Sequence, residues 1–311
     1  MTVLPKIVVG VDFSAESERA AGEALAVARH LGAALVLVHV CDTAELPALA
    51  EQGGPLAREA AAKIRQREAA GVEHAREALE ALRERLSGQG VDVSRMLMDH
   101  GSDQGLCAAA RLVGASLVVV GTHGRTGLRW ILLGSVAQRV VRECQADVLV
   151  VRGDQPSGHR RILVATDFSD GADRLLETAV ALAPAGTRID VLHVVDAGDM
   201  MGDGWLSTGA EAALWDALMS DLRARGEALA SRHARPGLEI AFHLAAERTA
   251  PAIIAWLETH GHDLAVLGTH RRKGLRRVLL GSVAEAVVRH APCSVLVVHR
   301  GSDPSVEATG A

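Results

Sequence analysis

The chain has 311 residues, of which 49% are apolar and 23% charged, a balance that excludes a fibrous or disordered protein and suggests two domains. Only 2% of the residues are aromatic and none is Tyr, which argues against a protein that stacks single-stranded nucleic acid on a row of rings. The formal net charge is −5, so the basic excess of a protein that binds the phosphate backbone of nucleic acid is missing as well.

The first half of the chain alternates short apolar runs with helical patterns. A run at 6–11 is followed by an alanine-rich helical pattern, and a second run covers 35–40. A long amphipathic helix is predicted over 56–86, because apolar residues recur there at intervals of three and four. The remaining predicted elements are a strand at 91–98, a helix at 105–113, a strand at 117–120, a helix of about ten residues from Ser135 and a strand at 148–151.

The second half of the chain repeats the first. Residues 117–151 align without a gap on 264–298 and match at 22 of 35 positions. Residues 6–14 match 161–169, so the chain is a tandem duplication, with a polar Gly- and Pro-containing linker at 153–159. We therefore predict two domains, at 1–152 and 160–300.

Apolar strands that alternate with helices indicate parallel sheets covered on both faces. The predicted fold class is therefore α/β, with two tandem, doubly wound, five-stranded parallel-sheet domains of the flavodoxin or Rossmann type. In such sheets ligands bind at the carboxyl ends of strands, where the strand order reverses.

Three strand ends in the first copy carry residues suited to a ligand site: Asp12, Val40 beside His39, and Gly121. Gly121 opens a segment that continues through Gly124 and, nine residues later, reaches Gly134 and Ser135 at the start of a helix. Glycine permits positive φ, so backbone N–H groups can turn inward to bind an anion, and the helix N-terminus adds its dipole. This combination predicts a phosphate site, although a Gly-rich loop alone is more often only a turn.

The G-x2-G-x9-G-S pattern, together with VDFS at 11–14 and HV at 39–40, resembles the universal stress protein family. The resemblance covers nearly the whole chain, twice. It implies a stress-response regulatory protein that binds ATP, with or without Mg²⁺, or a related adenine nucleotide. By motif, Asp12 and Val40 would recognise the adenosine end, while Gly121, Gly124, Gly134 and Ser135 would hold the phosphates. The family dimerises through its last strand, which implies an intramolecular pseudo-dimer here, and a further homodimer of the chain stays open.

The second copy departs from the pattern at one position. Arg271 stands where the first copy has Gly124, and four more basic residues follow before residue 278. Two interpretations stay open: a site that binds an anion through side-chain charge, or a degenerate half kept for pairing. The candidate residues of this copy are Asp167, Val194, Gly268, Gly281 and Ser282.

Several histidines occupy matched or clustered positions. His39 and His193 lie at matched strand ends, where a hydrogen-bonded structural role is expected rather than a metal site. His123 and His270 match in the two GTH motifs, and His260 and His262 are predicted to lie in a solvated turn. Trp130 has no aromatic counterpart in the second copy, and a packing role is expected for it.

Two other functions compete with nucleotide-dependent regulation. One is a slow ATPase, although the chain lacks GxxxxGK[ST], SGGxDS, HxGH and GxSxG motifs and we predict no catalytic residue. The other is a scaffold or chaperone-like binder that uses no nucleotide. Scattered cysteines favour free thiols in a reducing compartment over a disulfide framework, and no apolar stretch approaches the ~18 residues of a membrane span. We therefore expect a cytoplasmic protein with neither membrane nor nucleic-acid partners.

Overall fold

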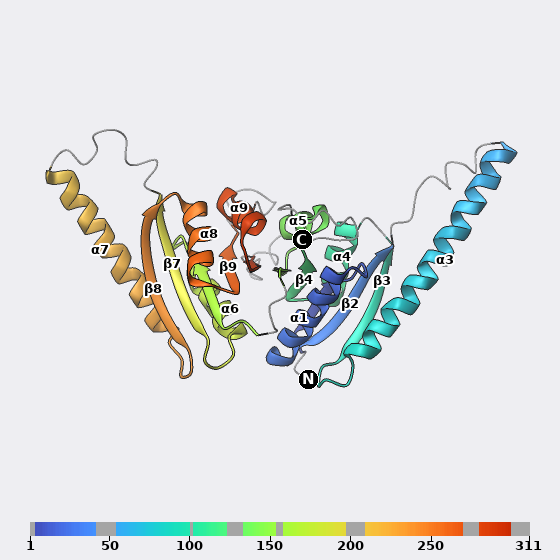
Figure 1. The fold of residues 1–311 in the computed structure, drawn as a ribbon, viewed down its shortest axis with the longest axis horizontal. Helices are drawn as coiled ribbons and strands as arrows, with labels where there is room; N and C mark the ends of the chain where they lie inside the picture. The colour runs from blue at the N-terminus through green and yellow to red at the C-terminus, as the bar shows by residue number, and fades with distance from the viewer. Residues whose placement is uncertain are drawn as a thin grey trace, which may run out of the picture. The chain divides into compact units, whose positions relative to one another are not determined.

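The computed structural model describes residues 4–41, 54–99, 102–122, 133–153, 158–196, 209–269 and 280–299. The chain divides into two compact units. The first unit comprises residues 1–127 and 134–140, and the second comprises 128–133 and 141–311. Each unit is an α/β layer structure in which helices cover a sheet (Figure 1).

The first unit holds a parallel sheet of four strands in the order β3-β2-β1-β4. The strands are β1 (Lys6–Gly10), β2 (Ala34–Cys41), β3 (Val93–Asp99) and β4 (Leu117–Gly121). The helices are α1 (Ala15–Leu31), α3 (Pro55–Leu86), α4 (Ser102–Val113) and the start of α5 (Ser135–Glu143). The strand order reverses between β1 and β4, where doubly wound sheets bind ligands.

The second unit holds six strands in the order β5-β10-β9-β6-β7-β8. They are β5 (Asp147–Val151), β6 (Arg161–Ala165), β7 (Arg188–Asp196), β8 (Glu239–Glu247), β9 (Leu264–Gly268) and β10 (Ser294–Val298). The helices are α6 (Ala172–Leu182), α7 (Gly209–Arg232), α8 (Thr249–His260) and α9 (Ser282–His290). Among the described residues of this unit, the strand pairs are parallel except β5 with β10, in which Leu149 lies opposite Leu296.

The predicted α/β class with mostly parallel sheets is confirmed, whereas the boundary between the compact units does not coincide with the boundary between the two repeats. Strand β5 belongs to the first sequence repeat, yet it pairs with β10 and clusters with the second unit. Strand β5 is apolar and buried, so an unpaired edge there would expose backbone donors and acceptors. Just after β5, the Arg152 guanidinium donates to the carbonyls of Val288, Arg289 and Ala291 at the end of α9, which ties this segment to the second copy.

Aliphatic side chains form the core, as the scarcity of aromatic residues predicts. Ile7, Leu35 and Leu37 of the first unit and Ile162, Leu163 and Ile189 of the second are fully buried. Helix α1 begins at the Ser14 cap, ends at Gly32 in the left-handed conformation, and buries a stripe of alanines that lets it lie close to the sheet. The long helix predicted over 56–86 is α3, which buries Ala75, Leu79 and Leu82.

The cysteines differ from the expectation of free thiols at two positions. Cys107 and Cys144 are disulfide-bonded, whereas Cys41 and Cys293 are free. Burial raises the pKa of the Cys293 thiol to about 12, so this thiol stays protonated at neutral pH. Within the described part of the chain, none of the helices combines the length and the apolar character needed to cross a membrane.

Candidate functional site

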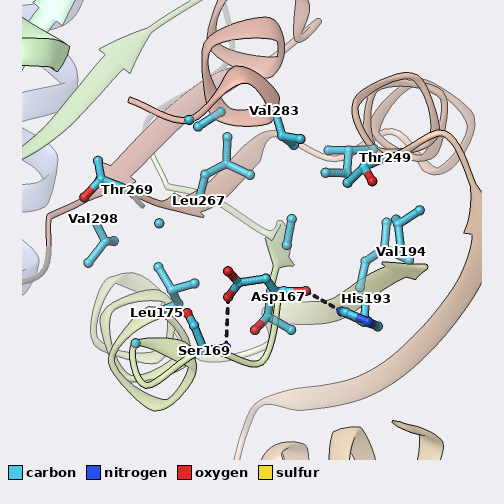
Figure 2. Close-up of a pocket in the computed structure, with 18 of the residues that line it drawn as sticks. Asp167, Ser169, Leu175, His193, Val194, Thr249, Leu267, Thr269, Val283 and Val298 are labelled. Carbon is cyan, nitrogen blue, oxygen red and sulfur yellow. Dashed lines mark hydrogen bonds between the residues drawn. The ribbon is translucent and has the colours of Figure 1, made fainter. Parts of the chain in front are cut away.

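A cavity of about 310 Å³ lies at the carboxyl edge of the sheet in the second unit. Thr249 and Val194 lie on one side of it, Thr269 and Val298 on the other, and Asp167 lies between them (Figure 2). All five candidate residues of the second copy line this cavity: Asp167, Val194, Gly268, Gly281 and Ser282. Its volume is near the lower end of the range for small-molecule sites, roughly 300–1,000 Å³.

The aspartates at the ends of β1 and β6 are held by short turns of the same kind. The Ser169 N–H donates to Asp167 Oδ1 at 2.9 Å. In the first copy, the Ser14 N–H and hydroxyl donate to Asp12 Oδ1 at 3.0 and 2.5 Å. These bonds fix each carboxylate beside the end of its strand, where it can still accept from a ligand because a carboxylate offers about four lone-pair sites.

A phenylalanine follows each aspartate in a strained backbone conformation. Phe13 has φ 64° and Phe168 has φ 56°, a left-handed region that bulky residues rarely adopt. The Phe13 ring lies 4.7 Å from that of His39, and the Phe168 ring lies 4.6 Å from that of His193. The same strain at matched positions indicates that both copies need this turn to present the aspartate.

The two matched histidines have the expected structural role. His39 donates through Nδ1–H to the Val11 carbonyl at 2.6 Å, and His193 donates to the Thr166 carbonyl at 2.8 Å. Each bond links the second strand of its copy to the loop that follows the first strand. Since Nδ1 is engaged in both cases, the bond also fixes the tautomer of the ring.

For the glycines of the motif that the structure describes, steric room explains the absence of a side chain better than a positive φ does. A Cβ at Gly121 would lie 3.1 Å from both the backbone carbon and the oxygen of Glu16, so a side chain there would press against the start of α1. At Gly268 the nearest atom to such a Cβ is Leu175 Cδ1 at 3.5 Å, an ordinary contact. Gly281 has φ −64°. The expectation that a left-handed conformation explains these glycines is therefore wrong at Gly281, and close approach explains Gly121.

The N-terminus of α9 supplies backbone donors to the cavity. Ser282, Val283 and Ala284 of its first turn all line the cavity, and Gly281 at the cap position has no side chain to occupy their N–H groups. The first N–H groups of a helix lack intrahelical partners and point at an anion placed on the axis. This end of the cavity is therefore suited to a negatively charged group.

The first-copy site is described in part. Asp12 follows β1, Val40 lies near the end of β2, Gly121 ends β4 and Ser135 begins α5. The Gly134 N–H donates to the Thr122 carbonyl at 2.7 Å and so brings the two ends of the motif together. Gly124 and the intervening loop lie outside the described residues. So do His123, Trp130, His270, Arg271 and the basic residues that follow it.

Comparison with known protein families gives a match to both copies of the repeat. The sequence profile of the universal stress protein family matches residues 4–152 and 158–299. The chain belongs to the universal stress protein family. A universal stress protein of Mycolicibacterium smegmatis is 29% identical over 303 residues, which cover 94% of this chain and 96% of that protein.

Of two further relatives, one matches a single copy of the repeat and the other matches the whole tandem chain. A universal stress protein of Methanocaldococcus jannaschii is 31% identical over 147 residues, which cover 46% of this chain and 83% of that protein. A crystal structure of a universal stress protein from Archaeoglobus fulgidus superposes with a TM-score of 0.66 at 23% identity, covering 96% of this chain and 97% of that one. The first matches about one copy and the second matches the tandem fold.

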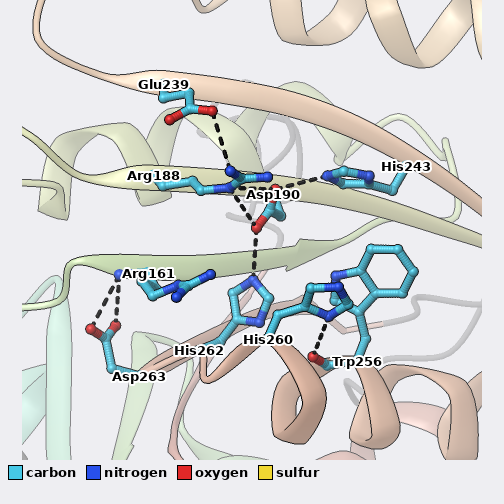
Figure 3. A network of polar contacts seen from close by, with 9 residues as sticks. All are labelled: Arg161, Arg188, Asp190, Glu239, His243, Trp256, His260, His262 and Asp263. Atoms are coloured by element: carbon cyan, nitrogen blue, oxygen red, sulfur yellow. Dashed lines mark hydrogen bonds and ion pairs between the residues drawn. The ribbon is translucent and has the colours of Figure 1, made fainter.

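This universal stress protein also has a buried polar cluster that sequence reasoning missed (Figure 3). Asp190, only 2% exposed, accepts from His243 Nε2 at 2.8 Å and from His262 Nε2 at 3.0 Å. Arg188 Nε lies 3.2 Å from both carboxylate oxygens. The prediction of a solvated turn is wrong for His262, whose side chain is fully buried.

The cluster is separate from the cavity. Asp190 lies near the start of β7 and His262 precedes β9, whereas the cavity forms at the ends of these strands. Burial alone would raise the pKa of Asp190, but the hydrogen bonds from His262 and His243 hold it well below its usual range. The carboxylate is therefore charged in the folded protein at any pH near neutral.

Proposed function

We propose that this universal stress protein is a regulatory protein that binds ATP, or a related adenine nucleotide, at the carboxyl edges of its sheets. The observation that carries the proposal is the convergence of Asp167, Val194, Gly268, Gly281 and Ser282 on one cavity in the second unit. The first copy has the corresponding strand ends and, in sequence, the complete glycine motif. Its site is therefore the principal one in this proposal.

The chemistry of the lining supports a division between two ends. A carboxylate at Asp12 or Asp167 can accept from a ribose hydroxyl or an adenine amino group, and valine and leucine at the strand ends can pack on the purine face. Because the chain has few aromatic residues, the purine would be held by aliphatic side chains. The phosphates, with Mg²⁺ when it accompanies them, would lie against the serine and the backbone N–H groups at the start of α5 or α9.

The direct test is to purify the chain, denature it, and identify and count the nucleotides released. We expect about one adenine nucleotide per chain if the first copy alone is filled, and two if both are. The Gly124→Arg variant copies the residue of the second copy and should lose the first-copy nucleotide. A chain that releases none, and binds none when titrated with ATP, ADP and AMP, would contradict the proposal.

A further inference from the structure

The two copies differ at the start of the helix that follows their first strand. In α1, Glu16 lies in the first turn and forms an ion pair with Arg19 at 3.3 Å. Gly171 occupies the position matching Glu16 in the second copy, and α6 begins only at Ala172. Gly171 lines the cavity and brings no side chain to it, while the acidic residue of this copy, Asp170 in place of Ala15, is exposed and lies outside the lining. A cavity lining without a carboxylate at this position is more favourable to an anion than one that has it.

The arginine that follows has acquired a different partner. Arg174, which matches Arg19, lines the cavity, and its Nη2 lies 3.4 and 3.3 Å from the two carboxylate oxygens of Asp147. Asp147 is only 12% exposed and also accepts from the His299 N–H at 2.8 Å. Since His299 directly follows Val298, which also lines the cavity, this contact locates the Arg174 guanidinium near the β10 side of the site.

The position of Arg174 fits the polarity of the cavity. Among the described residues that line it, Asp167 and Arg174 carry the charges. The cavity extends from Val194 and Thr249 past Asp167 to Thr269 and Val298 (Figure 2). The contact of Arg174 with Asp147, which accepts from the His299 N–H next to Val298, assigns Arg174 to the Val298 side. The helix α9 contributes its N-terminal donors to the same cavity. A guanidinium at this place can form paired, charge-assisted hydrogen bonds to a phosphate.

We propose that Arg174 binds the phosphate of a nucleoside monophosphate in the second-copy cavity, replacing by side-chain charge what that copy lacks in its glycine motif. The inference rests on the proposed function, because it deepens the ligand preference of the same kind of site. The cavity volume of about 310 Å³ suits a mononucleotide. In this proposal the guanidinium contacts the phosphate in place of Asp147 or together with it, since the Arg174 side chain is 48% exposed.

The test compares AMP with adenosine, which lacks the phosphate, by calorimetric titration of the full chain. The parent protein carries Asp12→Ala and Gly124→Arg, which disable the first-copy site, so that the titration measures binding to the second copy. We expect Arg174→Gln to weaken the affinity for AMP by at least about tenfold, because one charge-assisted interaction is lost. The affinity for adenosine should stay within about twofold of that of the parent. Arg174→Lys should restore part of the AMP affinity. Arg19→Gln, at the matched position of the first copy, should change neither.

The outcomes separate this inference from the function on which it rests. A parent that binds neither AMP nor adenosine would overturn both the inference and a second-copy nucleotide site. A parent that binds AMP while Arg174→Gln weakens AMP and adenosine equally, or weakens neither, would overturn the role of Arg174 alone. Because Arg174→Gln also removes the cation beside the largely buried Asp147, thermal unfolding of each variant is compared with that of the parent, and the Lys variant, which keeps the charge, guards against a folding defect.

Discussion

At the scale of single residues, the strand-end positions illustrate what a sequence pattern can and cannot reveal. Aspartate, valine and glycine could be assigned to the site by their places after apolar runs, and the matched histidines could be assigned a structural hydrogen bond. The left-handed Phe13 and Phe168 could not be predicted, because a bulky residue is the least expected occupant of that region. The available signal was the repetition of DFS at both strand ends.

Gly121 and Gly268 provide a matched pair for testing the close approach of α1. Gly121→Ala would place its Cβ 3.1 Å from the Glu16 backbone, whereas Gly268→Ala would meet only a leucine methyl at 3.5 Å. The intrinsic preference of alanine over glycine in a strand is common to both and cancels. We expect Gly121→Ala to be less stable than Gly268→Ala by about 1 kcal/mol, because of overpacking. Urea unfolding checks this, and equal free energies of unfolding would contradict the steric explanation.

At the scale of elements, the internal duplication shows that the buried polar cluster is not required by the fold. The residues of the first copy that match Asp190, His243 and His262 are Val36, Met96 and Ala115, all apolar. The element boundaries of the first copy could be predicted closely from periodicity. The cluster could not, because THGHD at 259–263 is as polar as an ordinary surface turn and the burial of His262 depends on a strand more than sixty residues earlier.

Removing one hydrogen-bond partner of Asp190 should lower the free energy of unfolding more than replacing Asp190 and both histidines together. His262→Ala leaves the buried Asp190 carboxylate short of a hydrogen bond, and we expect a loss of about 3 kcal/mol in the free energy of unfolding. The triple variant Asp190→Val, His243→Met and His262→Ala copies the first copy, and we expect it to be at least as stable as the parent. Chemical unfolding of both variants provides the measurement. A triple variant with a lower free energy of unfolding than His262→Ala would contradict this explanation.

The same cluster predicts a dependence of stability on acid. Because the pKa of Asp190 is lower in the folded protein than in the unfolded chain, its charged form favours folding. This contribution is complete above the unfolded pKa, about 3.9, and is lost as the pH falls below it. As the pH falls from about 5 to 2, the free energy of unfolding of the parent should therefore decrease relative to that of Asp190→Val. A difference independent of pH over that range would refute the assignment.

At the scale of the whole molecule, the fold class and the tandem organisation followed from the repeat, because the period of the repeat is a domain. The compact units were less predictable. Strand β5 belongs in sequence to the first copy, but its pairing with β10 and the contacts of Arg152 attach it to the second unit. Sequence periodicity reveals that a strand is buried on both faces, but not which strand lies beside it.

The most direct test of nucleotide binding is a calorimetric titration of the full chain with ATP, in parallel with Asp12→Ala and Asp167→Ala. We predict that ATP binds to the parent chain. We further expect Asp12→Ala to weaken ATP binding at the principal site by about tenfold or more, since a buried ligand hydroxyl or amino group would lose its acceptor. Asp167→Ala should leave that site unchanged and serves as the matched control. Failure of ATP to bind the parent chain, or binding that Asp12→Ala does not alter, would contradict the proposal.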